Sequence, residues 1–235
     1  MKKTFVVTGA SRGIGRAIAE RLVADGNTVL GIARNFNQAP FKSTCFHPIE
    51  FDLSNLEELP VKLAALVQQY PEIEGVVFNA GRGLFGSLEE FSYRSISDVI
   101  ALNLTSQIYL ARALIPHLKR KKQGDLIFIG SEAALKGTQK GTVYCATKFA
   151  LRGFVQALRE ECSRSGIRVS LVNPGMVRTD FFEELNFTPG NNEYNAIHPD
   201  DIAKTVALLL QLPKGTVVDE VNLSPLSKVI NFKPQ

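Results

Sequence analysis

Two side chains that could exchange a proton stand four residues apart in the stretch VYCATKFAL, residues 143–151: Tyr144 and Lys148. Residues at this spacing share one face of a helix. A free phenol titrates at about 10, and a nearby ammonium group lowers that pKa toward neutrality, where a general acid or base is most effective. The spacing therefore predicts a tuned proton donor and acceptor. The purely structural alternative is a helix tyrosine beside a snorkelling lysine.

A second candidate site is the stretch TGASRGIG, residues 8–15, which contains Gly9, Gly13 and Gly15. It follows a short apolar run and precedes a helical pattern. Glycine allows a sharp turn, and it lets a phosphate group approach the free N–H groups at a helix N-terminus. The stretch therefore predicts a nucleotide phosphate site, with a plain strand-to-helix turn as the alternative.

The elements that must position these residues alternate along the chain, because five helical stretches separate seven short apolar runs. This alternation is typical of a parallel sheet covered on both faces. The predicted fold is α/β: one domain over residues 1–235, with a Rossmann-type, doubly wound parallel sheet of about seven strands and helices on both faces. The strands are expected within residues 4–9, 28–34, 45–53, 73–81, 124–131, 167–175 and 217–224, and the helices within residues 16–26, 56–70, 93–122, 142–166 and 199–213.

Composition and charge weigh against several classes of function. The chain has 235 residues, a net charge of +4 and three cysteines, Cys45, Cys145 and Cys162, with no C-x-x-C pair. This odd number of cysteines indicates a reduced, cytoplasmic protein. The sequence has no run of 18 apolar residues, so no membrane span is predicted. No set of residues has the spacing of metal ligands, so no metal site is predicted. The basic run at 119–122 is expected to end a helix, so no nucleic-acid partner is predicted.

Taken together, the motifs resemble those of the classical short-chain dehydrogenase/reductase family. The family pattern TGxxxGxG corresponds to residues 8–15, and its NAG motif to residues 79–81. Asn103, Ser131 and the YxxxK pair follow in the family's order, and NPGMVRTDF at 173–181 is similar to its PG turn. One departure is Phe78, which stands where the family often has a first asparagine. The resemblance covers nearly the whole chain.

The resemblance implies a catalytic set of four residues: Asn103, Ser131, Tyr144 and Lys148. Tyr144 would be the acid and base, and Ser131 would bond to the substrate oxygen. Lys148 would lower the pKa of Tyr144 and bind the nicotinamide ribose, while Asn103 would hold a water that links Lys148 to solvent. The implied cofactor-binding residues are Gly9, Ser11, Arg12, Gly13, Ile14, Gly15, Arg34, Asp52, Leu53, Asn79, Ala80, Gly81, Tyr144, Lys148, Pro174, Gly175, Val177 and Thr179.

The end of the second predicted strand favours NADP(H) over NAD(H). An NAD enzyme usually places a carboxylate there for the ribose 2′-hydroxyl, whereas an arginine accommodates a 2′-phosphate. Here the sequence GIARN offers Arg34 and no acid, and Arg12 in the glycine loop is a second cation. Because a guanidinium group grips phosphate through two hydrogen bonds, NADP(H) is the predicted cofactor. If Arg34 is only solvated, NAD(H) is the alternative.

The predicted substrate pocket is apolar and comprises Phe85, Ser131, Met176, Phe181, Phe182 and Leu185. Phe187 lies on the same loop, which is expected to cover the site. The alternative is that some of these residues only pack a loop onto the domain. The chemistry predicted is NADPH-dependent reduction of a small-molecule ketone or aldehyde, and the reverse. One rival is a 3-oxoacyl-carrier-protein reductase, which would need a basic patch such as Arg82, Lys136, Lys140 and Arg178. Another is a non-catalytic dinucleotide-binding regulator. By resemblance, helices near residues 95–120 and 143–165 would build a homodimer or homotetramer.

Overall fold

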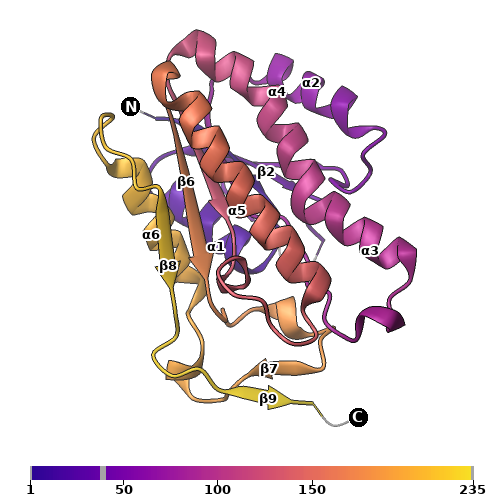
Figure 1. Cartoon of the computed structure of the whole chain (residues 1–235). Helices are drawn as coiled ribbons and strands as arrows, with labels where there is room; N and C mark the ends of the chain where they lie inside the picture. The colour runs from indigo at the N-terminus through magenta and orange to yellow at the C-terminus, as the bar shows by residue number, and fades with distance from the viewer. Residues whose placement is uncertain (1, 38–40, 234–235) are drawn as a thin grey trace.

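A seven-stranded, fully parallel sheet forms the centre of the computed structural model, which describes residues 2–37 and 41–233 (Figure 1). The strand order β3-β2-β1-β4-β5-β6-β8 reverses direction between β1 and β4. The predicted doubly wound sheet is therefore confirmed. Its strands are β1 (Thr4–Thr8), β2 (Thr28–Ala33), β3 (Phe46–Glu50), β4 (Ile73–Phe78), β5 (Gly124–Ile129), β6 (Ile167–Pro174) and β8 (Glu220–Leu223).

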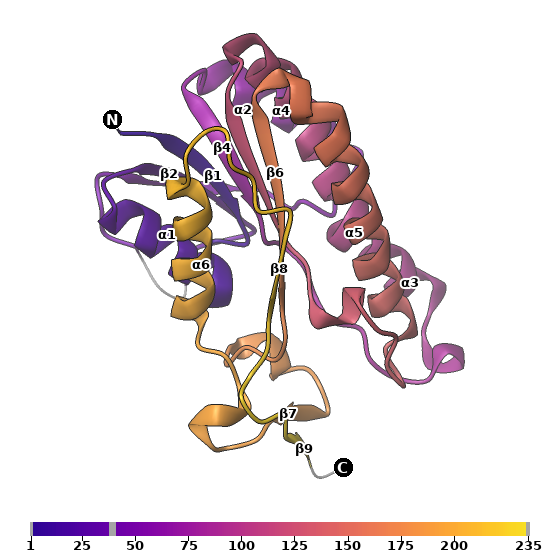
Figure 2. The same ribbon diagram turned by 60° about the vertical axis from the view of Figure 1, so that its left-hand side comes forward.

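Helices cover both faces of this sheet, as Figure 2 shows: α1 and α6 lie on one face, and α2, α4 and α5 lie on the other. Four of the five predicted helical stretches contain at least one of them, and the first, residues 16–26, overlaps α1, which begins earlier, at Gly13. The helices are α1 (Gly13–Ala24), α2 (Leu59–Gln69), α3 (Tyr93–Ile100), α4 (Ser106–Lys121), α5 (Thr142–Cys162) and α6 (Pro199–Gln211).

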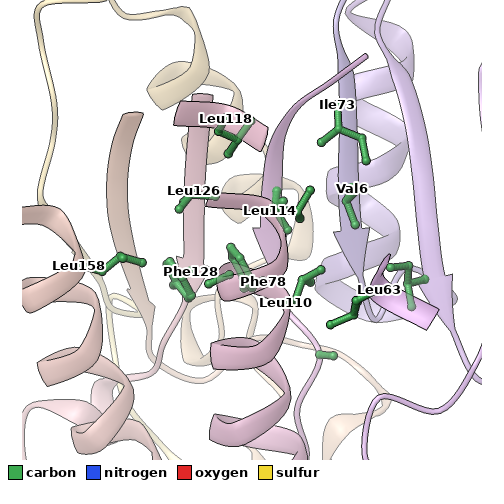
Figure 3. Packing of buried hydrophobic residues seen from close by; sticks show 14 of the residues in the cluster. Val6, Leu63, Ile73, Phe78, Leu110, Leu114, Leu118, Leu126, Phe128 and Leu158 are labelled. Carbon is green, nitrogen blue, oxygen red and sulfur yellow. The ribbon is translucent and has the colours of Figure 1, made fainter. Parts of the chain in front are cut away.

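Apolar residues on both faces of each central strand explain why these strands are continuous apolar runs. In β1, Val6 belongs to the cluster under α2, α4 and α5, while Phe5 and Val7 belong to the cluster under α1 and α6. This follows from the alternation of side chains along a strand. Figure 3 shows the first cluster, in which Phe78 stacks on Phe128 with ring centroids 4.0 Å apart. Phe78, the departure from the family pattern, is thus a core residue.

The helical stretch Tyr93–Lys121 contains an irregular turn that the sequence did not predict. Residues Ala101–Thr105 form a π-helical turn between α3 and α4. This stretch is long enough to cross a membrane, and its most apolar 18-residue window has a mean hydropathy of 1.2. The sequence had predicted no membrane span. One such helix is weak evidence, because core helices have the same composition. Leu110, Leu114 and Leu118 of α4 pack in the sheet core, which accounts for the apolar composition.

Two short strands outside the main sheet were also not predicted. β7 (Phe187–Pro189) and β9 (Ile230–Phe232) pair antiparallel. They lie beyond the carboxyl ends of the parallel strands, at the bottom of Figures 1 and 2. Strands of three residues carry too little periodicity to be recognised in a sequence. This pair joins the chain after β6 to the C-terminal segment.

Candidate active site

A cavity of about 1050 Å³ opens at the carboxyl ends of the parallel strands. This is where ligands of open α/β sheets bind, next to the point where the strand order reverses. Every predicted cofactor residue except the buried Gly15 lines this cavity. Of the predicted pocket residues, Phe85, Ser131, Met176, Phe181 and Phe182 line it and Leu185 does not.

The turn after β1 has the geometry of a phosphate cradle. Gly9 and Gly13 have φ angles of +66° and +57°, a conformation that favours glycine. A β-carbon on Gly15 would lie 2.2 Å from the carbonyl oxygen of Gly9, so no other residue fits there. Arg12, the N-cap of α1, makes no side-chain hydrogen bond to the first turn. The first-turn amides are therefore available to an anion, and the turn fits a dinucleotide pyrophosphate.

Thr8 and Asn79 hold this turn against the end of β4. The Thr8 hydroxyl oxygen accepts hydrogen bonds from the amides of Asn79 and Ala80, at 2.9 and 3.0 Å. In return, Nδ2 of Asn79 donates to the carbonyl oxygen of Thr8 at 3.0 Å. The Asn79 side chain thus positions the glycine turn, in addition to lining the cavity.

Asn103 lies in the π-helical turn, is fully buried and does not line the cavity. Its side-chain amide pairs with the backbone of Arg82: Oδ1 accepts from the amide, and Nδ2 donates to the carbonyl, both at 2.9 Å. Nδ2 also donates to Oγ1 of Thr147, next to Lys148, at 3.3 Å. Asn103 therefore ties the loop after β4 to α5 as a positioning residue. Its role in a water relay stays a prediction.

Ser131, Tyr144 and Lys148 meet at the cavity wall. Tyr144 and Lys148 share a face of α5, as their spacing predicted, and both are buried. Nζ of Lys148 lies 5.8 Å from the centroid of the Tyr144 ring and donates to the carbonyl oxygen of Ile129 at 3.1 Å. Oγ of Ser131 accepts from the amide of Ala133 at 3.2 Å, which fixes the direction of the serine side chain.

Burial controls the ionisation of this pair. It raises the pKa of Tyr144 to about 12, although the hydrogen bond with Ser131 acts to lower it. The neighbouring Cys145 and Glu132 act to raise it further. Burial also lowers the pKa of Lys148 to about 8. The sequence analysis predicted a lowered pKa for Tyr144 and was wrong in direction, because desolvation disfavours both charged forms. Tyr144 is therefore a protonated acid at neutral pH.

Arg12 and Arg34, the two predicted phosphate ligands, are exposed and line the cavity. Burial acts to raise the pKa of Asp52, and the positive charge of Arg34 acts to lower it. Hydrogen bonds from Ser54 and the charges of Arg34 and Arg82 outweigh that effect, and the pKa of Asp52 lies below its ordinary value. Arg12 faces a carboxylate on the segment after β6, with Nη1 3.9 Å from Oε2 of Glu183.

Aromatic rings surround the Tyr144 phenol. The Phe85 ring lies 5.0 Å from that of Tyr144 and 5.1 Å from that of Phe187, and the Phe181 ring lies 6.1 Å from Tyr144, centroid to centroid. Phe187, on the loop expected to cover the site, is a lining residue, whereas Leu185 of the same loop is not. The amide of Leu185 bonds to the carbonyl oxygen of Phe182, so the chain turns there. Phe187 then follows in β7 and lines the cavity.

The four cations considered for an acyl-carrier patch are not gathered at the cavity. Arg82 and Lys140 line it, whereas Lys136 and Arg178 do not. Nη2 of Arg178 donates to two backbone carbonyl oxygens of the segment after β6, so its role is structural.

Other lining residues escaped the sequence analysis: Glu132, Lys228, Ile230 and Phe232. Only the adjacency of Glu132 to Ser131 was visible in the sequence. Within residues 2–37 and 41–233, no three His, Cys, Asp or Glu side chains gather as metal ligands.

The fold and this site together define an oxidoreductase with a Rossmann-type sheet. A sequence model described as short chain dehydrogenase matches residues 3–189, which is most of the chain. The chain therefore belongs to the short-chain dehydrogenase family.

Similar proteins agree with this assignment. The sepiapterin reductase of Chlorobaculum tepidum is 29% identical over 97% of this chain and 98% of its own. An alcohol dehydrogenase from Thermococcus sibiricus, solved in complex with 5-hydroxy-NADP, is 29% identical and has a TM-score of 0.83 over 97% of this chain and 99% of its own. A metagenomic short-chain oxidoreductase, solved with NADP, is 31% identical with a TM-score of 0.79 over 96% of this chain and 98% of its own.

Proposed function

We propose that this protein reduces a ketone or aldehyde to an alcohol with NADPH, and catalyses the reverse reaction. The observation that carries the proposal is the shared cavity: one wall holds Ser131 and the protonated Tyr144, and the glycine turn forms another part of it. A dinucleotide bound on that turn and a carbonyl compound near the phenol would occupy one continuous space.

Proton transfer from Tyr144 is the protein's part of this chemistry. The bound NADPH would supply the hydride that adds to the carbonyl carbon. The Ser131 hydroxyl donates a hydrogen bond to the carbonyl oxygen, and Tyr144 transfers its phenolic proton to the same oxygen, so that an alcohol forms. With a pKa of about 12, Tyr144 is almost entirely protonated at neutral pH, which suits the reduction. Lys148 lies one helical turn away and favours the phenolate that remains.

NADPH is the proposed cofactor because two guanidinium groups, Arg12 and Arg34, face the cavity. The glycine turn would hold the pyrophosphate, and these two side chains would bind the 2′-phosphate. Two similar structures support the choice, since both proteins were solved with NADP or a derivative of it.

The proposal includes a second copy of the chain and a cytoplasmic location. Helices α4 and α5 carry apolar side chains that stay partly accessible: Phe149 is 45% exposed, and Tyr109 and Phe154 are partly buried. A homodimer or homotetramer through these helices would bury them, and light scattering would report its mass. The cysteines Cys45, Cys145 and Cys162 are unpaired, as is usual in a reducing compartment.

The test is the oxidation of NADPH with a panel of aliphatic and aromatic ketones, aldehydes and 3-oxoacyl thioesters. We expect turnover with NADPH, at least about 10-fold slower turnover with NADH, and loss of at least about 1000-fold in Tyr144→Phe. Tyr93→Phe, at a tyrosine that is 94% exposed, is the matched control and should be fully active. Arg34→Gln should weaken NADPH and leave NADH unchanged.

Three results would contradict the proposal in different ways. A preference for NADH would remove the role assigned to Arg12 and Arg34. Turnover of 3-oxoacyl thioesters alone would favour the acyl-carrier reductase. Tight NADPH binding with no turnover, unchanged in Tyr144→Phe, would favour a dinucleotide-binding regulator.

A further inference from the structure

The C-terminal end of the described chain forms a strap, residues 227–233, across the cavity. β9 lies within the strap and pairs with β7. At its far end, Nζ of Lys233 donates to the carbonyl oxygens of Phe182 and Glu183, at 2.8 and 2.7 Å. These bonds attach the strap to the segment that follows β6, so the two chain segments form one wall.

The near end of the strap is attached at two further places. The amide of Ser227 donates to the carbonyl oxygen of Tyr194 at 3.0 Å, and Nδ2 of Asn195 donates to the carbonyl oxygen of Ser227 at 2.9 Å. Lys228 forms an ion pair with Glu132, the residue after Ser131. The strap is therefore held in place relative to the reacting groups.

Alternate residues of the strap face the cavity. Lys228, Ile230 and Phe232 line it, as the two-residue period of an extended chain requires. Between them, Asn231 lies opposite Thr188 in the register of β9 and β7 and is not a lining residue. The strap thus presents one face to the substrate end of the cavity and the other face away from it.

The face that lines the cavity offers apolar surface. Phe232 is 76% exposed and Ile230 is 42% exposed, although both border a cavity. The two ammonium groups of the strap are already engaged, Lys228 by the carboxylate of Glu132 and Lys233 by backbone carbonyls. Contact of these apolar side chains with an apolar ligand would remove both surfaces from water, which is favourable.

We propose that Ile230 and Phe232 are specificity-determining residues, which select carbonyl compounds that carry an apolar tail over small polar ones. The proposal rests on the proposed carbonyl reduction. With the carbonyl oxygen at Ser131 and Tyr144, the tail extends past the ring of Phe187 in β7 to the strap that pairs with it. The strap then acts on the choice of substrate and leaves the proton transfer unchanged.

The test is a series of methyl ketones with one reacting group and tails of different length: butan-2-one, hexan-2-one, octan-2-one and 4-phenylbutan-2-one. In the wild type, kcat/KM should rise with the tail, by up to about 4-fold for each buried methylene group. Phe232→Ala should lower the ratio of kcat/KM for octan-2-one to that for butan-2-one about 10-fold, and Ile230→Ala about 3-fold. The value for butan-2-one should change less than about 2-fold.

Asn231→Ala is the matched control, because it removes a side chain from the same strand on the opposite face; its ratio should equal that of the wild type. Equal ratios in Phe232→Ala and the wild type would overturn the proposal. If the wild type reduces neither ketones nor aldehydes, the proposed function fails separately, and calorimetry with the alcohols butan-2-ol to octan-2-ol tests the strap. A gain in affinity with chain length that is smaller in Phe232→Ala supports the proposal, and an equal gain overturns it.

Discussion

Lys148 carries an ammonium group that is buried at the wall of the cavity. Its side chain is 5% exposed, and Nζ has a protein partner at the carbonyl oxygen of Ile129. Burial of the charge lowers its pKa from 10.5 to about 8, so the protonated form destabilises the folded state. A residue kept under such a cost is typical of a site built for chemistry.

Lys148→Met should therefore stabilise the protein at pH 7 while abolishing reduction. Below about pH 8, burial of the ammonium group lowers the free energy of unfolding of the wild type by about 3 kcal/mol. The variant avoids this penalty but loses the hydrogen bond to Ile129, which is worth about 1 kcal/mol. The net gain should be about 2 kcal/mol in the free energy of unfolding, measured with urea. Because the unfolded lysine binds more protons between pH 8 and 10.5, wild-type stability rises with pH across that range, and the advantage of the variant should disappear by about pH 10. A variant less stable than the wild type at pH 7 would contradict this account.

In the proposed reduction, Glu132 is a second ionisable group that would act through another residue, Tyr144. Its carboxylate acts to raise the pKa of Tyr144, and it forms an ion pair with Lys228. Reduction needs the protonated phenol, so activity is lost as the pH rises through the pKa of Tyr144. Glu132→Gln should move that alkaline limb to lower pH, by up to about one unit.

The measurement is kcat/KM for reduction against pH. An unchanged limb in Glu132→Gln would show that Glu132 does not act on Tyr144 through its charge.

Among the elements, β5, β6 and α6 are joined by one arginine. Nε of Arg168 in β6 lies 2.6 Å from Oδ1 of Asp125 in β5, and both side chains are nearly buried. The guanidinium group also donates to the carbonyl oxygens of Leu210 and Leu212 at the end of α6, at 3.3 and 2.9 Å. It therefore pairs a buried charge and satisfies the last carbonyl groups of a helix.

Arg168→Met should destabilise the protein by about 3–5 kcal/mol, because it leaves the buried carboxylate of Asp125 without its partner. Arg21→Met, which removes the more exposed i,i+4 pair with Asp25, is the control and should cost less than about 1 kcal/mol. The double variant Asp125→Leu/Arg168→Met should recover part of the loss. Thermal and urea unfolding measure all three, and equal losses in Arg168→Met and Arg21→Met would refute the assignment.

At the scale of the whole molecule, the two faces of one sheet each carry an apolar cluster. Neither cluster can form unless the sheet is intact. Consecutive residues of β1, such as Val6 and Val7, belong to opposite clusters. Unfolding of the helices on one face would expose one set of strand side chains to water. The same strands supply the other cluster, so both clusters would be weakened.

We therefore expect a single cooperative unfolding transition. The midpoints in urea from far-ultraviolet circular dichroism, which reports helices, and from tyrosine fluorescence should coincide. The chain has no tryptophan and five tyrosines, so tyrosine fluorescence is a usable second probe. Two separated midpoints would show that the two faces unfold independently.

Much of this fold could be predicted because its signals are local. The seven strands and the helical stretches follow from apolar periodicity, and Gly9 and Gly13 are needed by the turn in which they lie. The relation of Tyr144 to Lys148 follows from helical spacing alone. Such features depend on residues within a few positions of one another, which a sequence displays directly.

Other features depend on residues far apart in the chain, and only the tertiary structure decided them. The meeting of Phe187 with Phe85, the pairing of β9 with β7 and the contact of Lys228 with Glu132 have no local signature. The direction of the pKa of Tyr144 belongs to this group as well, because it depends on how much water the folded chain excludes. The sequence by itself determined the sheet, the glycine turn after β1 and the pairing of Tyr144 with Lys148 on one helix face. The folded chain decided the electrostatics of that pair and the walls of the cavity, since both arise from burial by distant segments.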